Sequence, residues 1–129
     1  MSNGPPPSVR CLLSSLPTKH VGDKVRFLGC VTEYSTHSAI LTLQHEYPKG
    51  SKVKVDTDVT LLLQNLNSEH TDIGQWVHLI GYITSIKQIF AKPTTTSHVV
   101  SIGVQALVLW IAEDLDISSY EKTLTLETE

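Results

Sequence analysis

The chain has 129 residues and a mass of 14.2 kDa, enough for one domain that buries roughly two thirds of its unfolded surface. Hydrophobic residues make up 40% and charged residues 18%, and no apolar run approaches the ~20 residues of a membrane-spanning helix. These features, with only two cysteines and no heptad run, exclude a disordered chain, a helical membrane protein, a disulfide scaffold, a structural zinc site and a coiled coil.

The net charge of −3 is unevenly distributed along the chain. Residues 1–111 carry a net +2, whereas residues 112–129 carry a net −5. A body that is only faintly basic predicts weak or assisted nucleic-acid binding at most. Residues 1–8 contain three consecutive prolines and are expected to be disordered or extended. They lack the apolar core of a secretory signal, so we expect a cytosolic or nuclear protein.

Taken in chain order, the pattern predicts five strands and a terminal helix. Residues 8–16 are expected to form a helical turn or a short strand that Pro17 ends. In the first strand, 24–35, hydrophobic residues alternate with polar ones, and Gly29 marks a bulge or a tight bend. The remaining strands are predicted over residues 38–45, 52–59, 74–87 and 99–110.

The connections between these strands differ in composition. Residues 61–66 are too densely apolar for strand alternation and predict a short helix, whereas residues 67–72 form a polar connection. Residues 88–98 are expected to be a loop. Residues 113–125 predict an acidic helix that carries one apolar stripe.

This order of elements predicts an all-β fold with short helices, namely a five-stranded OB-fold Greek-key barrel with a C-terminal helix. Glycines within the first, fourth and fifth strands fit the strong coiling of a small barrel. Another small β-barrel or sandwich remains open on the pattern alone. The expected organisation is a leader at 1–8, the barrel at 9–112, and a helix with an acidic tail at 113–129.

Several segments carry a family resemblance. They are LLSSLP at 12–17, KVRFLGCV at 24–31 with Tyr34, LQHEYP at 43–48, GQWV at 74–77 and IGY at 80–82. Together they resemble fungal Ten proteins, the smallest subunits of the trimeric telomere-capping complex CST. The resemblance implies a non-enzymatic nuclear subunit at telomeres. Its partners would be an OB-fold Stn subunit, the larger CST subunit and single-stranded telomeric DNA, which it would bind weakly when alone.

Catalytic and metal-binding signals are absent from the sequence. It contains no nucleophile elbow, Walker phosphate loop or zinc-protease motif. Asp56 and Asp58 could hold a divalent metal, but a charged, exposed strand face is the favoured interpretation. The six histidines show no short ligand spacing. We therefore expect no enzyme, no cofactor and no metal site.

Single-strand binding by an OB-fold requires cations for the phosphates and flat rings for base stacking. The candidates are Lys49, Lys52, Lys54, Lys87 and Lys92 for phosphates, and Tyr34, Tyr47 and Phe90 for stacking. Asp56 and Asp58 share the face with Lys54, so we expect a weak, sequence-tolerant contribution that matters only inside a complex.

The expected partner surface combines the helix stripe with the outward side of the first strand. Its candidates are Leu115, Ile117, Tyr120 and Leu124 on the helix, and Arg26 and Leu28 on the strand. The stripe could instead close an open end of its own barrel. If it meets the Stn partner, Tyr120 is the expected hot spot, because aromatic anchors dominate interface energetics.

Two further functions remain open besides the capping subunit. One is a stand-alone single-stranded nucleic-acid binder, and the other is an OB-fold that acts purely as a protein-interaction adaptor.

Overall fold

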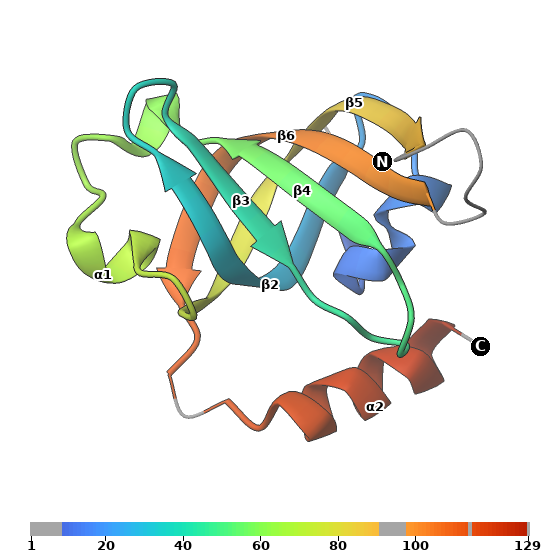
Figure 1. Cartoon of the computed structure of the whole chain (residues 1–129). Coiled ribbons are helices and arrows are strands. Elements are labelled where there is room, and N and C mark those ends of the chain that lie inside the picture. Colours follow the sequence, from blue (N-terminus) through green and yellow to red (C-terminus); the bar gives the residue numbers. More distant parts are fainter. Residues whose placement is uncertain (1–8, 91–97, 114, 129) are drawn as a thin grey trace, which may run out of the picture.

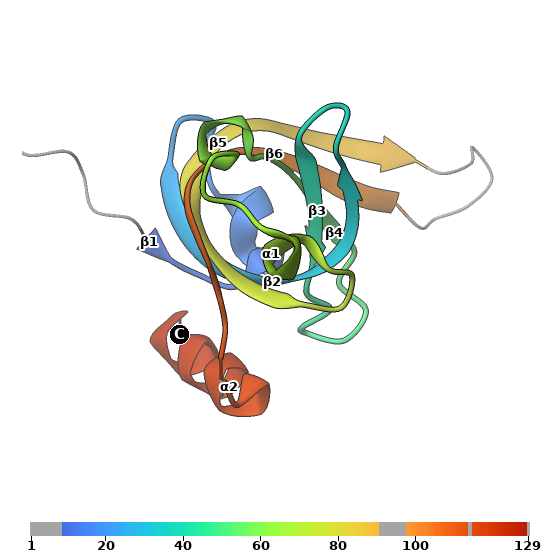
Figure 2. The ribbon, with the colours of Figure 1, turned by 90° about the vertical axis from the view of Figure 1, so that its left-hand side faces the viewer.

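Six strands form one curled sheet, seen in a computed structural model that describes residues 9–90, 98–113 and 115–128 (Figure 1). The strands are β1 (Val9–Arg10), β2 (Lys24–Ser35), β3 (Ile40–Gln44), β4 (Val53–Asp58), β5 (Trp76–Phe90) and β6 (His98–Ile111). Their order in the sheet is β1-β2-β3-β4-β6-β5, and β2 also pairs with β5. That last pairing closes a five-stranded barrel, which Figure 2 shows end-on.

The strand pairings are those of an OB-fold. Strands β2, β3 and β4 pair antiparallel in sequence order, β4 then pairs parallel with β6, and β5 pairs antiparallel with both β6 and β2. The predicted fold class is confirmed. The short β1 pairs parallel with the start of β2 and forms an edge of the sheet. For residues 8–16 the sequence had left open a helical turn or a short strand.

Alternation along the strands sets the barrel core. Val25, Phe27 and Val31 of β2 are buried inside the barrel, as the period-two pattern predicted. Gly29 lies on the same strand where the backbone packs closely, because a Cβ there would lie 2.9 Å from the Cβ of Leu43. A larger residue would push β3 away, so glycine allows the two strands to approach.

The short helices between the strands differ from the prediction in two places. The 3₁₀ helix η1 (Leu13–Thr18) buries Leu13 and Leu16, and it contains Pro17 rather than ending before it. The fixed φ of proline matches 3₁₀ geometry, which explains the wrong prediction. The predicted short helix is η2 (Thr60–Leu62). The predicted polar connection contains a further helix, α1 (Ser68–Thr71).

Helix α1 is held by a capping box that residue composition alone did not reveal. The side chain of Asn67 accepts a hydrogen bond from Glu69 N at 3.0 Å, and His70 Nδ1 accepts one from Asn67 N at 3.1 Å. Figure 2 shows α1 and η1 within the outline of the barrel when it is viewed along its axis.

The C-terminal helix α2 (Ile117–Thr128) lies outside the barrel (Figures 1 and 2). It begins later than predicted because Asp116 acts as its cap, accepting hydrogen bonds from the backbone N of Ser119 at 3.2 Å and from its hydroxyl at 3.0 Å. These bonds also lower the pKa of Asp116. Strands β5 and β6 extend into the predicted loop, whose residues 91–97 lie outside the described residues, as does the leader at 1–8.

Candidate partner and nucleic-acid surfaces

The apolar stripe of α2 docks on the outer side of its own barrel. Tyr120 and Leu124 are buried against Leu12 and against Leu28 of β2. Other half-buried apolar residues complete this cluster, namely Tyr47, Trp76, Ala112 and Leu115. Leu28, one of the two outward candidates on this strand, is therefore covered by the chain's own helix, on the side of the barrel rather than at an open end.

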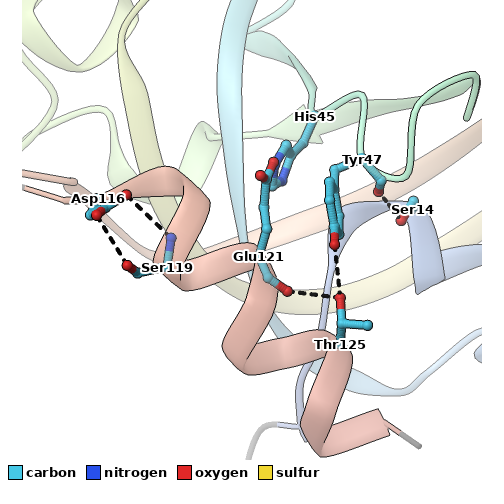
Figure 3. Close-up of polar contacts among 7 residues, drawn as sticks. All are labelled: Ser14, His45, Tyr47, Asp116, Ser119, Glu121 and Thr125. Atoms are coloured by element: carbon cyan, nitrogen blue, oxygen red, sulfur yellow. Dashed lines mark hydrogen bonds and ion pairs between the residues drawn. The ribbon is translucent and has the colours of Figure 1, made fainter.

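Polar contacts join the same helix to the loop between β3 and β4 (Figure 3). His45 Nε2 lies 2.6 Å from Glu121 Oε2, and the His45 side chain is only 2% exposed. The hydroxyl of Tyr47 lies 3.2 Å from Thr125 Oγ1, while Ser14 Oγ donates to the carbonyl of Tyr47 at 2.5 Å. Loop, helix and η1 are thereby tied together.

The sequence did not single out His45, because an isolated histidine resembles any surface histidine. Its position in the resemblance segment at 43–48 was the one signal that could have drawn attention to it. Tyr47, a predicted base-stacking ring, instead lies in the cluster beneath α2.

Beside α2, rings and guanidinium groups gather on the outward side of β2, β5 and β6. We call this surface the aromatic wall; it comprises Arg10, Arg26, His78, Ile80, Val108, Trp110 and Tyr120. The Cζ atom of Arg26 lies 5.2 Å from the centre of the Trp110 ring, and that of Arg10 lies 5.5 Å from Tyr120. The His78 and Trp110 rings stack with centres 5.1 Å apart.

The aromatic wall has a positive local field. Burial lowers the pKa of His78, and the charges of Arg26 and Arg10 lower it further. Burial also raises the pKa of the Tyr120 hydroxyl. Within the described part of the chain, neither arginine forms an ion pair. Each guanidinium instead lies over an aromatic ring.

The face over β3 and β4, where OB-folds commonly hold single strands, is a polar groove. It is lined by Glu33, Ser35, Ser38, Ile40, Thr42, Lys54 and Asp56. Asp56 accepts a hydrogen bond from Thr42 at 3.1 Å and lies 3.9 Å from Lys54 Nζ. Two carboxylates against one lysine give this groove little attraction for phosphate.

Asp56 and Asp58 both make hydrogen bonds within the fold. Asp58 Oδ1 accepts a hydrogen bond from Thr60 N at 2.9 Å at the start of η2. The described residues contain no group of three side chains that could hold a metal ion. They also contain no helix long and apolar enough to cross a membrane. Both cysteines are free thiols, and burial raises the pKa of Cys11 to about 11.

The predicted nucleic-acid residues are spread over several surfaces. Lys49 and Lys52 are exposed in the β3–β4 loop, and the β4–β6–β5 register aligns Lys54 with Ser101 and Lys87. Tyr34 is half-buried against the barrel core. The side chain of Phe90 and the whole of Lys92 lie outside the described residues.

Comparisons with known proteins agree on family and fold. A family model described as telomere capping, CST complex subunit (Ten1) matches residues 1–125. A chain of the S. pombe Stn1–Ten1 complex has 20% identity and a TM-score of 0.70, covering 97% of this chain and 95% of that chain. S. pombe Ten1 itself gives 20% identity and 0.67, covering 95% and 98%.

The likeness extends to another OB-fold assembly. A structure of U. maydis replication protein A bound to single-stranded DNA has 16% identity and a TM-score of 0.58, covering 95% of this chain and 92% of that chain. No curated protein sequence matches the chain. At these identities the structural likeness establishes the OB-fold. The family assignment rests on the family model that matches residues 1–125.

Proposed function

The chain belongs to the Ten1 family of telomere-capping CST complex subunits, and on that basis we propose that it pairs with a Stn-type OB-fold subunit. Within this pair and the larger CST subunit it stabilises the engagement of telomeric single-stranded DNA. It acts as a non-enzymatic component, located in the nucleus at chromosome ends.

The aromatic wall is the observation that carries the partner assignment. Val108 is 47% exposed and lies in register with Ile80, which lies in register with Arg26. Trp110 extends the surface beneath the guanidinium of Arg26. Interface centres are enriched in tryptophan, tyrosine and arginine and depleted in carboxylates, and this wall has the same composition. The similar S. pombe chain comes from a Stn1–Ten1 complex, which contains a partner of the same type.

The predicted residues of α2 lie beside this surface and hold one edge of it in place. Tyr120 forms one edge of the wall, while Leu124 and Leu28 anchor α2 to the barrel. Leu115 and Ile117 are half-buried near the start of the helix. We infer that α2 shapes the partner surface and contributes its Tyr120 edge to the contact.

In this proposal, the chain binds DNA together with its partner rather than alone. The groove over β3 and β4 holds Glu33 and Asp56 beside Lys54, so few phosphates could be neutralised there. In the complex, the chain therefore gains DNA affinity through its partner. This supports an assisted binder over a stand-alone one.

The test is size-exclusion chromatography with light scattering, on the chain alone and co-expressed with the Stn-type subunit, followed by titration with fluorescent telomeric single strand. A 1:1 complex that binds DNA more tightly than either subunit supports the proposal. A stable monomer that ignores the partner and binds single strands tightly identifies a stand-alone binder. A 1:1 complex without any gain in DNA affinity identifies a pure adaptor.

A further inference from the structure

An apolar hollow lies between the end of β6 and the segment that contains η2 and α1. Both short helices contact β6, and Figure 1 shows α1 beside the end of that strand. The hollow has a volume of about 220 Å³. It is lined by Leu62, Asn65, Leu66, His70, Leu107, Val108 and Leu109. A cavity of about 150 Å³ already accepts a benzene ring, so this hollow has room for one leucine side chain.

The lining of this hollow suits an aliphatic side chain. Five of its seven residues are leucine or valine, and none is an acid, a lysine or an arginine. The Nδ1 atom of His70 is already used, because it accepts the hydrogen bond from Asn67 N. A charged side chain would lose its hydration here without gaining an opposite charge, whereas an aliphatic one would leave water for an apolar surface.

The edge of β6 beside the hollow has no strand next to it. β4 pairs with β6 only as far as Gln105, because β4 ends at Asp58 and the chain then turns into η2. Beyond that point, the described strands pair with β6 on one side only, through β5. The row that β4 occupies is therefore open beside residues 106–111.

The peptide groups at this open edge can be assigned from the antiparallel pattern. Ala112 N donates to the carbonyl of Trp76 at 2.9 Å, and alternate residues of an antiparallel strand bond to the same neighbour. Ala112 and the residues two and four positions before it therefore bond to β5, while the peptide groups of Leu109 and Ile111 point to the open edge. Within the described chain, one local bond reaches these groups, from Glu113 N to the carbonyl of Ile111. Both N–H groups and the carbonyl of Leu109 can thus pair with an added strand.

The hollow is continuous with the aromatic wall. Val108 belongs to both surfaces, and its side chain is 47% exposed. Leu61 and Leu63 adjoin the lining in sequence and are 65% and 46% exposed. Exposed apolar residues that lie close together mark a protein contact. A partner that covers the wall at Val108 therefore also reaches the hollow.

We propose that an extended segment of the Stn-type partner adds to the open edge of β6 and places one aliphatic side chain in the hollow. Main-chain hydrogen bonds to Leu109 and Ile111 hold the segment, and the hollow selects leucine, isoleucine or valine. Alternate side chains of a strand point to opposite faces, so every second residue of the segment can face the hollow. This inference rests on the proposed pairing with a Stn-type subunit and specifies how part of that contact is made.

The first test measures amide hydrogen exchange on the ¹⁵N-labelled chain, alone and in complex with the unlabelled Stn-type subunit. In the chain alone, the amides of Leu109 and Ile111 should exchange faster than those of Val108 and Trp110, which bond to β5. In the complex, exchange at Leu109 and Ile111 should slow at least about tenfold. Equal protection of all four amides in the lone chain shows that the edge is not open. Unchanged exchange in the complex shows that no strand is added, and either result overturns the inference.

The second test fills the hollow. Asn65 lies on its lining and is exposed, so Asn65→Trp places a ring in the space without removing a core side chain. It should weaken the heterodimer about tenfold in titration calorimetry. Gln64→Trp adds the same ring at an exposed neighbouring position outside the lining and should leave the affinity unchanged. Thermal unfolding shows that both variants are folded, and equal affinities for the two would remove the hollow from the contact.

The outcome for this inference is separable from that for the proposed function. Co-purification with the Stn-type subunit tests the pairing, whereas exchange at Leu109 and Ile111 tests the added strand. A heterodimer that forms while these two amides keep their fast exchange rejects the strand and retains the pairing. Failure to form the heterodimer rejects the pairing, and the inference with it.

Discussion

The barrel presents two outward faces of contrasting chemistry, the aromatic wall and the groove over β3 and β4. On the wall, arginines lie over aromatic rings and lack ion pairs within the described chain. In the groove, Asp56 is engaged by Thr42 and Lys54. The wall thus combines cations with aromatic rings, whereas the groove places two carboxylates beside one lysine. Of the two faces, the wall has the composition of a protein interface and the groove has little attraction for phosphate.

The largest expected effect comes from loosening α2, whose Tyr120 forms one edge of the aromatic wall. Leu124 is fully buried between α2 and the barrel, so Leu124→Ala should lower the free energy of unfolding by about 2–4 kcal/mol. Urea denaturation measures this loss, and hydrogen exchange shows whether α2 detaches. The exposed Ser118 on the same helix provides a control, since Ser118→Ala should stay within about 0.5 kcal/mol. A loss below that value in Leu124→Ala would mean that α2 is not held by this contact.

The next effect places a charge on the exposed part of the wall. Val108→Asp should leave the fold intact, because the side chain is 47% exposed, but should weaken the heterodimer by about 2 kcal/mol or more. Val21, 62% exposed in the turn before β2, gives the matched control Val21→Asp. Titration calorimetry with the Stn-type subunit compares the two. Equal affinities for both variants would remove the wall as the partner surface.

A third effect addresses the Tyr120 edge. Tyr120→Ala should weaken the heterodimer by more than 1 kcal/mol, because it removes the ring beneath Arg10 and beside His78. Tyr120→Phe keeps the ring and should retain most of the affinity. Since the ring is also 93% buried, calorimetry is run where circular dichroism shows both variants folded. Unchanged affinity in the folded Tyr120→Ala variant excludes this edge from the contact.

A substitution in the groove over β3 and β4 should have a smaller effect than those in the wall, and it should raise an affinity rather than lower it. Asp56→Asn removes one negative charge and keeps an oxygen that can accept from Thr42. DNA affinity of the heterodimer should rise about two- to threefold at low salt, and the gain should shrink as salt increases. Asp72→Asn, in an exposed loop, is the charge-matched control. If both substitutions act alike, the strand does not cross this groove.

The smallest effect is a pH dependence that arises from the wall. Burial and the two arginines lower the pKa of His78 in the folded chain, below its ordinary value of 6.5. The unfolded chain therefore binds more protons as the pH falls below 6.5, and stability decreases from there toward the folded pKa. Above pH 6.5, neutral His78 makes its full contribution to the free energy of unfolding. Denaturation at about pH 7.5 and 5.5 should show a smaller loss in His78→Gln than in the parent, and equal losses would contradict the assignment.

Much of the barrel core could be predicted because buried and outward residues alternate along most of its strands, between the register shifts of β2, β5 and β6. Val77, Leu79 and Ile83 all lie on the buried side where the alternation placed them. The short helices were harder, because a turn of 3₁₀ helix around Pro17 and a capping box at Asn67 depend on local geometry more than on composition. The family could be predicted from the segments that carry the resemblance, among them residues 24–31 and 43–48.

The candidate sites were only partly predictable. Arg26 and Tyr120 were named as partner residues, yet their companions Trp110 and His78 were noted only as members of strands. Strand register, which pairs His78 with Trp110 and Ile80 with Val108, assembles the wall. Register depends on pairing between segments far apart in the chain, and no single segment encodes it.

The sequence by itself indicated the buried side of the strands at 24–35, 38–45, 52–59 and 74–87 through local alternation, and its resemblance to a known family supplied the family and favoured the OB-fold. Only the tertiary structure decided where the outward residues meet. It placed Leu28 under α2 and joined His45 to Glu121 across 76 positions of sequence. The physical reason is that burial is read from a periodic pattern, whereas contacts between outward side chains depend on the three-dimensional closure of the barrel.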